Sequence, residues 1–333
     1  MKTYKGFDKD FKCRDFQYEV GKDYKMPEDG IKVCKNGFHA CESPLEVLDH
    51  YPLFDKDGNS NRFAEVEQSG NIDKEPNSTK VCSSRIRVKA ELSLAGLIKA
   101  GVEWILNSVK GTAPREGAGQ LNDNSGDFAK IGSSGDYAQI GSSGDSAQIG
   151  SSGYSAQIGS SGECAQIGSS GDYAQIGSSG YSAKIGSSGY SAKIGSSGYS
   201  AKIGSSGYSA QIGSSGHYAQ IGSSGHYAQI GSSGDYAQIG SSGDSAQIGS
   251  SGYYAQINST GEDSVICCAG HECMVKAKQG SWVTLSEWKW DETKKRAVPV
   301  MVKTIRIDGK RYKADTWYML KNKKVVKVQE GEQ

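Results

Sequence analysis

The sequence predicts a mainly β protein built around a two-sided parallel β-solenoid, and three observations support this prediction. Ile recurs at fifteen positions, every nine residues, from Ile131 to Ile257. The nine-residue unit reads Ile-Gly-Ser-Ser-Gly-x-y-Ala-z, where slot x is Asp, Tyr, His or Glu, slot y is Tyr, Ser, Phe or Cys, and slot z is Gln or Lys. Glycine is over-used, at 45 residues, but its strict period indicates an ordered repeat rather than disorder.

Each unit is expected to supply one strand of about five residues and one turn of about four. Ala138 and Ile140 are two residues apart, so strand alternation places them on one face, with Tyr137, Gln139 and Gly141 pointing outward. The Ser-Ser-Gly-x segment would form the turn, with Gly free to adopt a positive φ, and Ser hydroxyls could form ladders between coils.

A single unit cannot bury its Ala and Ile, so two units back to back must form one coil of 18 residues. Stacked coils then bury a thin continuous core, and at about 4.8 Å per coil they give a rod of roughly 35–45 Å. The pattern fades toward Ile266 and Val275, and Gly280–Leu285 reads as one more unit with a one-residue slip. The solenoid is therefore predicted to span residues 122–285.

Three regions flank the predicted solenoid. Residues 1–90 have short mixed strands and turn signals, which predict a small α+β domain. Residues 91–121 contain an apolar stripe of helical period from Leu94 to Val109, with Ser93 as N-cap, and we expect this helix to cover the first coil.

The last region, 286–333, alternates like strands and predicts a small β domain. Val300–Ile307 leads into Asp308-Gly309, a typical hairpin turn, and residues 316–320 and 325–328 could pair behind it.

Composition excludes several classes of function. The net charge of +1 and pI near 7.5 argue against a nucleic-acid binder. No run of 18 apolar residues predicts a membrane span, and residues 1–8 lack the apolar core of a signal peptide. The eight cysteines are spread over a long chain, which favours a reducing cytoplasm over a secreted disulfide scaffold.

Metal chemistry has two candidate locations. A calcium-binding β-roll needs a carboxylate in nearly every turn, but slot x is Tyr or His through the centre of the repeat, so calcium is disfavoured. In the N-terminal region, Cys13, Cys34, His39 and Cys41 are four potential zinc ligands, although their spacing matches no familiar zinc finger. The alternative is that these side chains pack in the domain core, and we expect no cofactor.

No catalytic motif is found: the chain lacks a Walker loop, a Rossmann fingerprint, Gly-x-Ser-x-Gly and His-Glu-x-x-His. Cys267, Cys268, His271 and Cys273 are close in sequence, but in degenerate repeat units Cys is expected to act as a small apolar residue. We therefore predict a protein that is not an enzyme.

The outward slots are the candidate binding surface, because rigid aromatic surfaces favour protein binding. Consecutive units alternate sides, so Lys184 and Lys202 should share a face, with Lys193 opposite. The alternative is that the tyrosines only stack along the rod and stabilise it. The candidate binding residues are Tyr154, Tyr181, Tyr190, Tyr199, Tyr208, Lys184, Lys193, Lys202, His217 and His226.

Several segments resemble an uncharacterised family of phage and prophage proteins, in which an N-terminal Gly-Phe-His-Ala-Cys domain precedes nonapeptide repeats. The matching segments are Tyr4–Asp8, Phe16–Lys22, Gly37–Leu45, Gly280–Trp288 and Asp308–Tyr318. The repeat is also similar to bacterial ice-nucleation repeats, although those use 16-residue units and Thr-x-Thr faces. The outward file of Tyr or Ser, Gln or Lys, and Gly differs from such a face.

This resemblance implies a phage-encoded interaction protein in the cytoplasm of an infected bacterium, binding and inhibiting a host defence protein. The alternatives are a structural rod of the virion or tail, a small-molecule sponge, an ice-binding-like protein, and an enzyme with a catalytic N-terminal domain. Exposed ladders on the solenoid faces, or the C-terminal domain, could also support a homo-oligomer.

Overall fold

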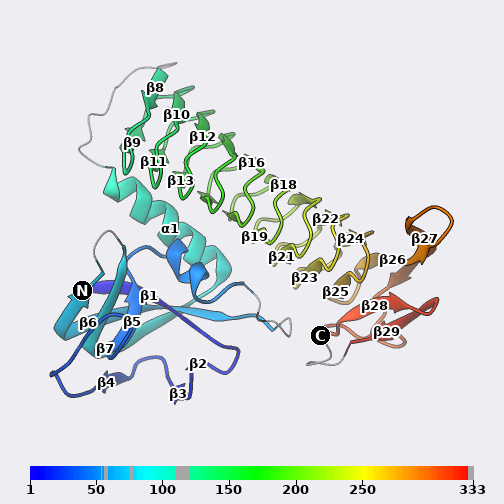
Figure 1. The fold of residues 1–333 in the computed structure, drawn as a ribbon, viewed down its shortest axis with the longest axis horizontal. Coiled ribbons are helices and arrows are strands. Elements are labelled where there is room, and N and C mark those ends of the chain that lie inside the picture. Colours follow the sequence, from blue (N-terminus) through cyan, green and yellow to red (C-terminus); the bar gives the residue numbers. More distant parts are fainter. Residues whose placement is uncertain (54, 56–58, 76–77, 110–120, 329–333) are drawn as a thin grey trace. The chain divides into compact units, whose positions relative to one another are not determined.

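The computed structural model describes residues 1–53, 55, 59–75, 78–109 and 121–328 (Figure 1). The chain forms two compact units. The N-terminal unit comprises Met1–Trp104, and the solenoid unit begins at Ile105 and contains the repeat.

The N-terminal unit is built on an antiparallel sheet with the strand order β4-β7-β5-β1-β6. Because β7 also pairs with β6, the strands β7, β5, β1 and β6 form a closed ring of pairings. A short hairpin and a 3-10 helix complete the unit. The bounds are β1 (Lys2–Phe7), β2 (Lys12–Cys13), β3 (Phe16–Gln17), β4 (Asp23–Lys25), β5 (Phe38–Cys41), η1 (Leu45–Asp49), β6 (Arg62–Lys74) and β7 (Lys80–Leu92).

Two apolar clusters fill this unit. One is aromatic: Phe7 and Phe11 stack with ring centroids 4.2 Å apart, and Tyr18 and Phe38 join them. The other includes Tyr4, Val47, Phe63 and Leu97. Leu97 lies near the start of α1 (Leu94–Ser108), which is the only α-helix among the described residues, so the beginning of this helix packs in the second cluster.

Helix α1 begins as expected, because the N–H of Gly96 donates to Oγ of Ser93 at 3.2 Å. Its end lies against the first coil, as expected, because a Cβ built on Gly132 would lie 3.1 Å from Cγ2 of Val109, and it also reaches the coils that follow. A Cβ built on Gly150 would lie 2.9 Å from Cγ2 of Val109, and one built on Gly168 would lie 3.2 Å from Cβ of Ile105. The last turn therefore lies along the side of successive coils, over a file of glycines that leaves it room.

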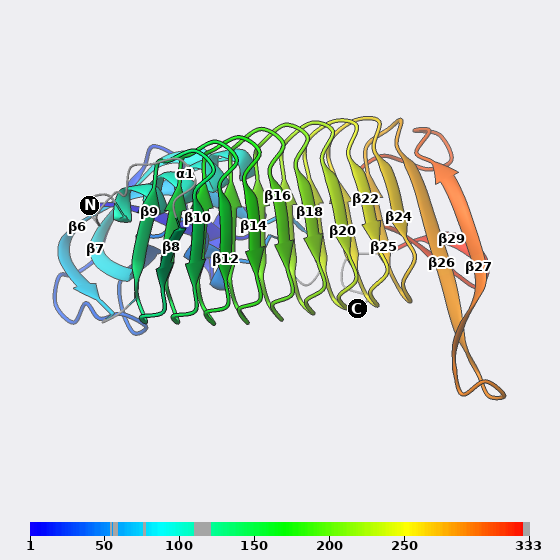
Figure 2. The same ribbon diagram turned by 90° about the horizontal axis from the view of Figure 1, so that it is seen from above.

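The solenoid unit contains two parallel sheets that face each other, and Figure 2 shows the strands of successive coils side by side. The first sheet contains β8 (Leu121–Asn124), β10 (Gln139–Ser142), β12 (Gln157–Ser160), β14 (Gln175–Ser178), β16 (Lys193–Ser196), β18 (Gln211–Ser214), β20 (Gln229–Ser232), β22 (Gln247–Ser250) and β24 (Val265–Cys268). The second sheet contains β9 (Lys130–Ser133), β11 (Gln148–Ser151), β13 (Gln166–Ser169), β15 (Lys184–Ser187), β17 (Lys202–Ser205), β19 (Gln220–Ser223), β21 (Gln238–Ser241), β23 (Gln256–Ser259) and β25 (Met274–Ala277).

The coil length of 18 residues is confirmed by the register. Ile140 of β10 pairs with Ile158 of β12, and Ile149 of β11 pairs with Ile167 of β13. The Ile and Ala files are buried and form one continuous core along the solenoid.

The division of the unit into strand and turn differs from the prediction. Each strand has four residues, for example Gln139–Ser142, so Ile140 and Ser142 point inward while the Ala belongs to the turn. The residue with positive φ is the one in slot y, such as Tyr137 at 57°, and no repeat glycine has a positive φ. This backbone directs the slot y N–H to the next coil, where Tyr137 donates to the carbonyl oxygen of Tyr154 at 2.7 Å.

The second glycine of each unit is instead required by close approach. A Cβ on Gly216 would overlap the carbonyl oxygen of Gly198 in the preceding coil, and the same overlap recurs at equivalent glycines. The first glycine of each unit in the first sheet has open space above it: a Cβ on Gly213 would meet nothing within 4 Å. A clash between coils therefore makes glycine necessary at the second position of each unit, whereas no clash does so at the first position in the first sheet.

Among the described residues, most inward serines do not form the expected hydroxyl ladders between coils. In several units the Oγ accepts from the N–H of the glycine two residues later, as between Ser196 and Gly198 at 3.2 Å. In others, including Ser151 and Ser187, the buried hydroxyl has no hydrogen-bond partner among the described residues. Neighbouring coils are joined by the backbone instead, for example from the N–H of Ser197 to the carbonyl oxygen of Ser178 at 3.0 Å.

The C-terminal region extends both sheets. The expected one-residue slip is present, because Val265 of β24 pairs with Trp282 of β26 (Trp282–Asp291). The hairpin predicted at Asp308-Gly309 is wrong. The chain turns between β26 and β27 (Arg296–Arg306), and these two strands pair with each other. The predicted pairing of the last two strands is confirmed for β28 (Tyr318–Lys321) and β29 (Lys324–Lys327), and β28 joins β25 in the second sheet.

Asp308 explains the failed hairpin, because its carboxylate accepts from the N–H groups of Lys310 and Tyr312 at 2.8 and 3.0 Å and forms a local turn instead. Ile305, Ile307 and Leu320 join the core of the solenoid. None of the helices in the described part of the chain is both long enough and apolar enough to cross a membrane.

Candidate functional site

The turns of the solenoid form two edges, one following the strands of the first sheet and one following those of the second. Slots x and y lie at the tip of each turn, and their tyrosine side chains are exposed along both edges. We call the resulting rows of rings the first-edge ladder and the second-edge ladder. The first-edge ladder consists of Tyr181, Tyr199, Tyr218, Tyr236 and Tyr254, and the second-edge ladder of Tyr137, Tyr154, Tyr173, Tyr190, Tyr208 and Tyr227.

The ladders are continuous because slots x and y complement each other. In the first-edge ladder, Tyr181 and Tyr199 stack in slot x with centroids 5.0 Å apart, and the row then passes to slot y at Tyr218, 5.4 Å from Tyr199. Tyr236 and Tyr254 continue it at 5.0 Å. An aromatic ring therefore lies in one slot or the other in every consecutive coil of the row.

The second-edge ladder changes slots at almost every coil. Tyr137 lies in slot y, Tyr154 in slot x and Tyr173 in slot y, with centroid distances of 5.9 and 5.3 Å. Tyr190 and Tyr208 then stack in slot x at 5.4 Å, with an interplanar angle of only 7°.

The two ladders contain the tyrosines predicted from slot x, and His217 and His226 lie beside them, with His217 5.6 Å from Tyr199 and His226 6.2 Å from Tyr208. Sequence reasoning left out the slot y tyrosines. The signal was the reciprocal use of the slots: where one edge position has Ser in slot y, slot x of the same unit is often aromatic.

The acidic residues of slot x have a structural use that requires no calcium. The carboxylate of Asp172 accepts from the N–H of Tyr190, 18 residues later, at 2.7 Å, and Asp235 accepts from Tyr253 at 2.8 Å. His226 replaces the carboxylate at one position, where its Nδ1 accepts from the N–H of Asp244 at 3.3 Å. These side chains satisfy a turn N–H of the next coil, so Asp in slot x and Tyr in slot x are two ways of joining coils.

The flat faces hold the predicted lysines. Lys193 lies exposed on β16 of the first sheet, and Lys184 and Lys202 lie in register on β15 and β17 of the second sheet, as expected. The prediction that all three lysines belong to an exposed binding surface is wrong for Lys184 and Lys202, which are buried with relative exposures of 7% and 9%. A long open groove follows the outer face of the first sheet from β10 to β24, because its glycine file carries no side chains. Gln211, Lys193 and Gln229 are among the side chains along this groove.

The N-terminal unit contains a separate pocket of about 770 Å³, a size typical of small-molecule sites. Its wall combines cations with aromatic rings. The cationic residues are Lys5, Arg14, Lys35 and Lys80, and the aromatic residues are Tyr4, Phe16, Tyr18, Phe38 and Tyr51; Asp15 is the acidic residue of the lining.

Lys5 is the most unusual of these residues, because its side chain comes from β1 and is 95% buried, with a relative exposure of 5%. Its ammonium donates to the carbonyl oxygen of His39 at 2.9 Å and to Sγ of Cys13 at 3.3 Å. It also lies 5.5 Å from the ring centroid of Tyr18. No carboxylate in the described part of the chain lies within ion-pair distance of this ammonium.

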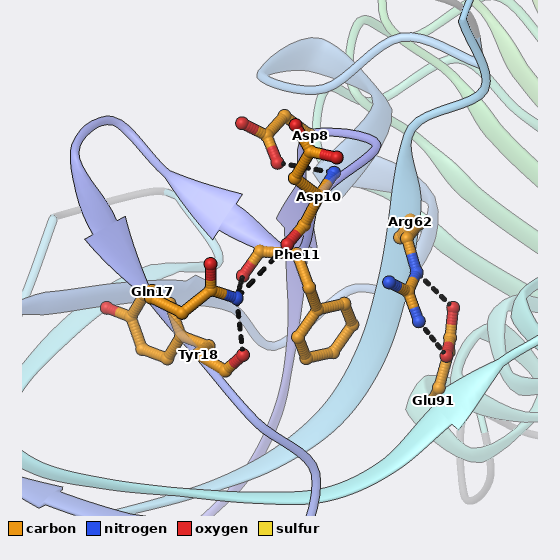
Figure 3. Close-up of polar contacts among 7 residues, drawn as sticks. All are labelled: Asp8, Asp10, Phe11, Gln17, Tyr18, Arg62 and Glu91. Atoms are coloured by element: carbon orange, nitrogen blue, oxygen red, sulfur yellow. Dashed lines mark hydrogen bonds and ion pairs between the residues drawn. The ribbon is translucent and has the colours of Figure 1, made fainter.

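The segment between β1 and β4 carries much of the pocket wall and is held by local hydrogen bonds (Figure 3). The amide nitrogen of Gln17 donates to the carbonyl oxygens of Asp10 and Tyr18 at 3.1 and 3.0 Å. The carboxylate of Asp8 accepts from the N–H groups of Asp10 and Lys12 at 2.9 and 2.8 Å.

These bonds position Arg14, which has a φ of 55°, and the exposed ring of Phe16. Beside this segment, the guanidinium of Arg62 lies 4.6 Å from the ring centroid of Phe11 and pairs with both carboxylate oxygens of Glu91 at 2.7 and 2.6 Å (Figure 3). The segment that builds the pocket wall is thus held by its own hydrogen bonds and, at the ring of Phe11, by the guanidinium of Arg62.

The four predicted zinc ligands all line this pocket, but each has other interactions. Nε2 of His39 accepts from the N–H of Cys34 at 2.9 Å, and burial, followed by the charge of Lys5, lowers the pKa of His39. Burial raises the pKa of the Cys41 thiol to about 12, which disfavours the thiolate that zinc requires. Across the described residues, no three His, Cys, Asp or Glu side chains are grouped to hold a metal ion.

The other cysteine cluster belongs to the solenoid core. Cys268 and Cys273 are buried, and Sγ of Cys273 donates to the carbonyl oxygen of Gly252 at 3.3 Å. Burial raises the pKa of the Cys268 thiol, whereas its hydrogen bond with Cys273 lowers the pKa of Cys273. Cys267 is exposed on the groove side of β24 and takes no part in the core.

Comparison with known proteins bears on the N-terminal unit. Residues 1–100 match the family described as a domain of unknown function (DUF7666). Searches among curated proteins and among solved structures found no match. The matched range includes every residue that lines the pocket and ends before the repeat.

Proposed function

We propose that the protein is a non-enzymatic interaction protein that binds a partner protein through the aromatic ladders of its solenoid. The observation that carries the proposal is the continuity of the ladders: exposed rings follow one another along each edge at 5.0–6.1 Å. Rings that are already held by their neighbours lose little conformational entropy when a partner covers them.

The ladders have the composition of a binding surface. Tyrosine is enriched at the energetic centres of protein interfaces, because a large apolar ring and a hydroxyl can both be used. Tyr137 is 57% exposed and Tyr227 is 53% exposed, so much of each ring is available. Hydrogen bonds between coils use the backbone and the acids of slot x, and the hydroxyls of Tyr199 and Tyr208 also hydrogen-bond to Tyr218 and Tyr227 of the next coil.

Because Tyr4–Asp8 and Gly37–Leu45 resemble segments of phage and prophage proteins, we place the proposed function in a phage infection. There the protein acts in the cytoplasm of an infected bacterium and binds a host protein, with inhibition of a defence protein as the consequence. A rigid rod suits this task because it presents the same surface over many coils at no folding cost on binding.

The experiment is recovery of partners from infected cells with matched ladder variants. The first-edge variant combines Tyr218→Ser, Tyr236→Ser and Tyr254→Ser, and the second-edge variant combines Tyr137→Ser, Tyr173→Ser and Tyr227→Ser. Serine occupies slot y with the same positive φ in other coils, for example Ser209 at 58°, so the variants should fold. The control is Gln211→Lys with Gln229→Lys, since slot z accepts both residues.

We expect one host protein to co-purify in a fixed ratio with the native protein and the control, and to be lost from at least one ladder variant. Mass spectrometry of purified virions distinguishes this proposal from a structural rod of the virion or tail. Only the structural rod requires the protein in stoichiometric amount in the particles. Recovery of the same partner in equal amount with both ladder variants would refute the role of the ladders.

A further inference from the structure

We propose that the pocket of the N-terminal unit binds a nucleotide, meaning a small molecule with a phosphate group and a planar aromatic ring. Three features of the pocket combine to indicate this class: a buried ammonium without a carboxylate, further cations at the wall, and an exposed aromatic ring at the same wall. None of them depends on the solenoid, so this proposal is separate from partner binding by the ladders.

The buried ammonium of Lys5 indicates an anionic ligand. Burying a charge is costly unless a partner compensates it, and the partners of Lys5 are a carbonyl oxygen, a thiol and the rings of Phe7 and Tyr18, none of which carries a negative charge. An ammonium has three donors, and the described contacts use two of them. A phosphate oxygen in the pocket would take the third donor and supply the missing negative charge.

Further cations surround the same point. The charges of Lys5, Arg14 and Lys80 all lower the pKa of His39 after the larger effect of burial, so their fields converge there. Lys80 is partly neutralised, because its ammonium lies 3.2 Å from the carboxylate of Glu75. Arg14 comes from the segment fixed by Gln17, and its guanidinium offers the fork of donors that suits a phosphate.

The aromatic wall indicates a planar ring. Phe16 is 46% exposed, although it lines the pocket and contacts Tyr18, Tyr24 and Phe38 at centroid distances of 4.8, 5.3 and 6.2 Å. These neighbours hold the ring in place while leaving part of it uncovered. Burial also raises the pKa of Tyr18, so its hydroxyl stays neutral.

The arrangement also disfavours the competing ligand, a divalent metal. The lining contains one carboxylate, Asp15, and several cations, which would repel a metal ion. An uncharged apolar molecule would leave the charge of Lys5 uncompensated. A nucleotide is the common small molecule that satisfies both the cations and the ring.

The test is calorimetric titration of the full chain with the four nucleoside 5′-monophosphates, the four nucleosides and inorganic phosphate. At least one monophosphate should bind about tenfold more tightly than its nucleoside and than phosphate. The variants are Lys5→Met, Arg14→Gln and Phe16→Ala, and the control is Lys89→Gln, which removes an exposed cation of β7 that pairs with Glu67.

We expect each pocket variant to weaken the monophosphate about tenfold or more, with the control unchanged. Arg14→Gln and Phe16→Ala act at the pocket surface and keep the test decisive if Lys5→Met does not fold. The proposal fails if no monophosphate binds, if nucleosides bind as tightly as monophosphates, if phosphate alone binds as tightly, or if the folded pocket variants bind like the native protein.

Discussion

The solenoid unit and the N-terminal unit use the same kinds of residues in opposite ways. In the solenoid, the same core position recurs in every coil, so that Ile140 and Ile158 are paired and equally buried. In the N-terminal unit, the important side chains come from separate segments: Lys5 from β1, Arg14 from the β2–β3 turn and His39 from β5. Repeated units thus give the solenoid an extended regular surface, whereas different residues from separate segments line a pocket in the N-terminal unit.

The largest expected effect concerns glycine in the solenoid. Gly216→Ala should lower the free energy of unfolding by about 3 kcal/mol or more, because the new Cβ overlaps the carbonyl oxygen of Gly198. The matched control is Gly213→Ala in the same unit, where a Cβ meets nothing within 4 Å. Chemical denaturation followed by circular dichroism measures both, and equal midpoints would refute the role of close coil stacking.

Substitution of a glycine in the N-terminal unit should destabilise the protein for a different reason. Gly70 has a φ of +77°, and a Cβ there would also overlap Oγ of Ser84. Gly70→Ala should cost about 1–2 kcal/mol from the backbone conformation. Gly70→Ala with Ser84→Ala removes the overlap but keeps the backbone strain and loses the hydrogen bond from the N–H of Asn71 to Oγ of Ser84, so it should recover only part of the stability. Full recovery would show that the contact alone makes glycine necessary.

High pH should destabilise the solenoid before it affects the core of the N-terminal unit. Loss of water around the hydroxyl of Tyr199, followed by the charges of Tyr218 and Tyr181, raises its pKa above the ordinary 10.0. A raised pKa means that the folded state retains the proton, so the stability it contributes is present below pH 10 and is lost as pH rises through the folded pKa.

The measurement is the unfolding temperature of the native protein and of the first-edge serine variant between pH 9 and 11, with tyrosine ionisation followed by absorbance near 295 nm. The native protein should lose more of its stability over this range than the variant. Parallel pH profiles would show that the ladders do not titrate as coupled rows.

The smallest effect concerns slot y, where a non-glycine residue adopts the left-handed conformation. Ser209 has a φ of 58°, and Asn tolerates this region better than Ser. Ser209→Asn should stabilise the solenoid by about 0.5 kcal/mol. The control is Ser214→Asn on the buried side of β18, which should destabilise instead; a loss of stability in Ser209→Asn would contradict the conformational argument.

Sequence period determines most of the solenoid, because every unit repeats the same burial requirement. It leads directly to two sheets, 18 residues per coil and the slip before Trp282. It does not distinguish the two glycines of a unit, because a close approach between coils depends on a stacking distance that no single unit reveals. The positive φ of slot y was missed for the same reason: that turn is defined by a hydrogen bond to the next coil.

The N-terminal pocket was only partly accessible from the sequence. Grouping Cys13, Cys34, His39 and Cys41 by residue type does bring together side chains that line one pocket. The residue that dominates its electrostatics, Lys5, has nothing in its local sequence to separate it from Lys2. Only the pairing of β1 with β5 and β6 shows that one of these two lysines is buried and the other exposed.

The alternation of units between two sheets has a consequence for how this chain can change length. Loss or gain of 18 residues removes or adds one whole coil, leaves every remaining ring on its own edge, and alters the rod by about 4.8 Å. Loss of nine residues moves every later unit to the opposite sheet, so the segment that follows β24 would have to start from the wrong side. Parity, more than length, is therefore the quantity that recombination among these near-identical repeats must conserve.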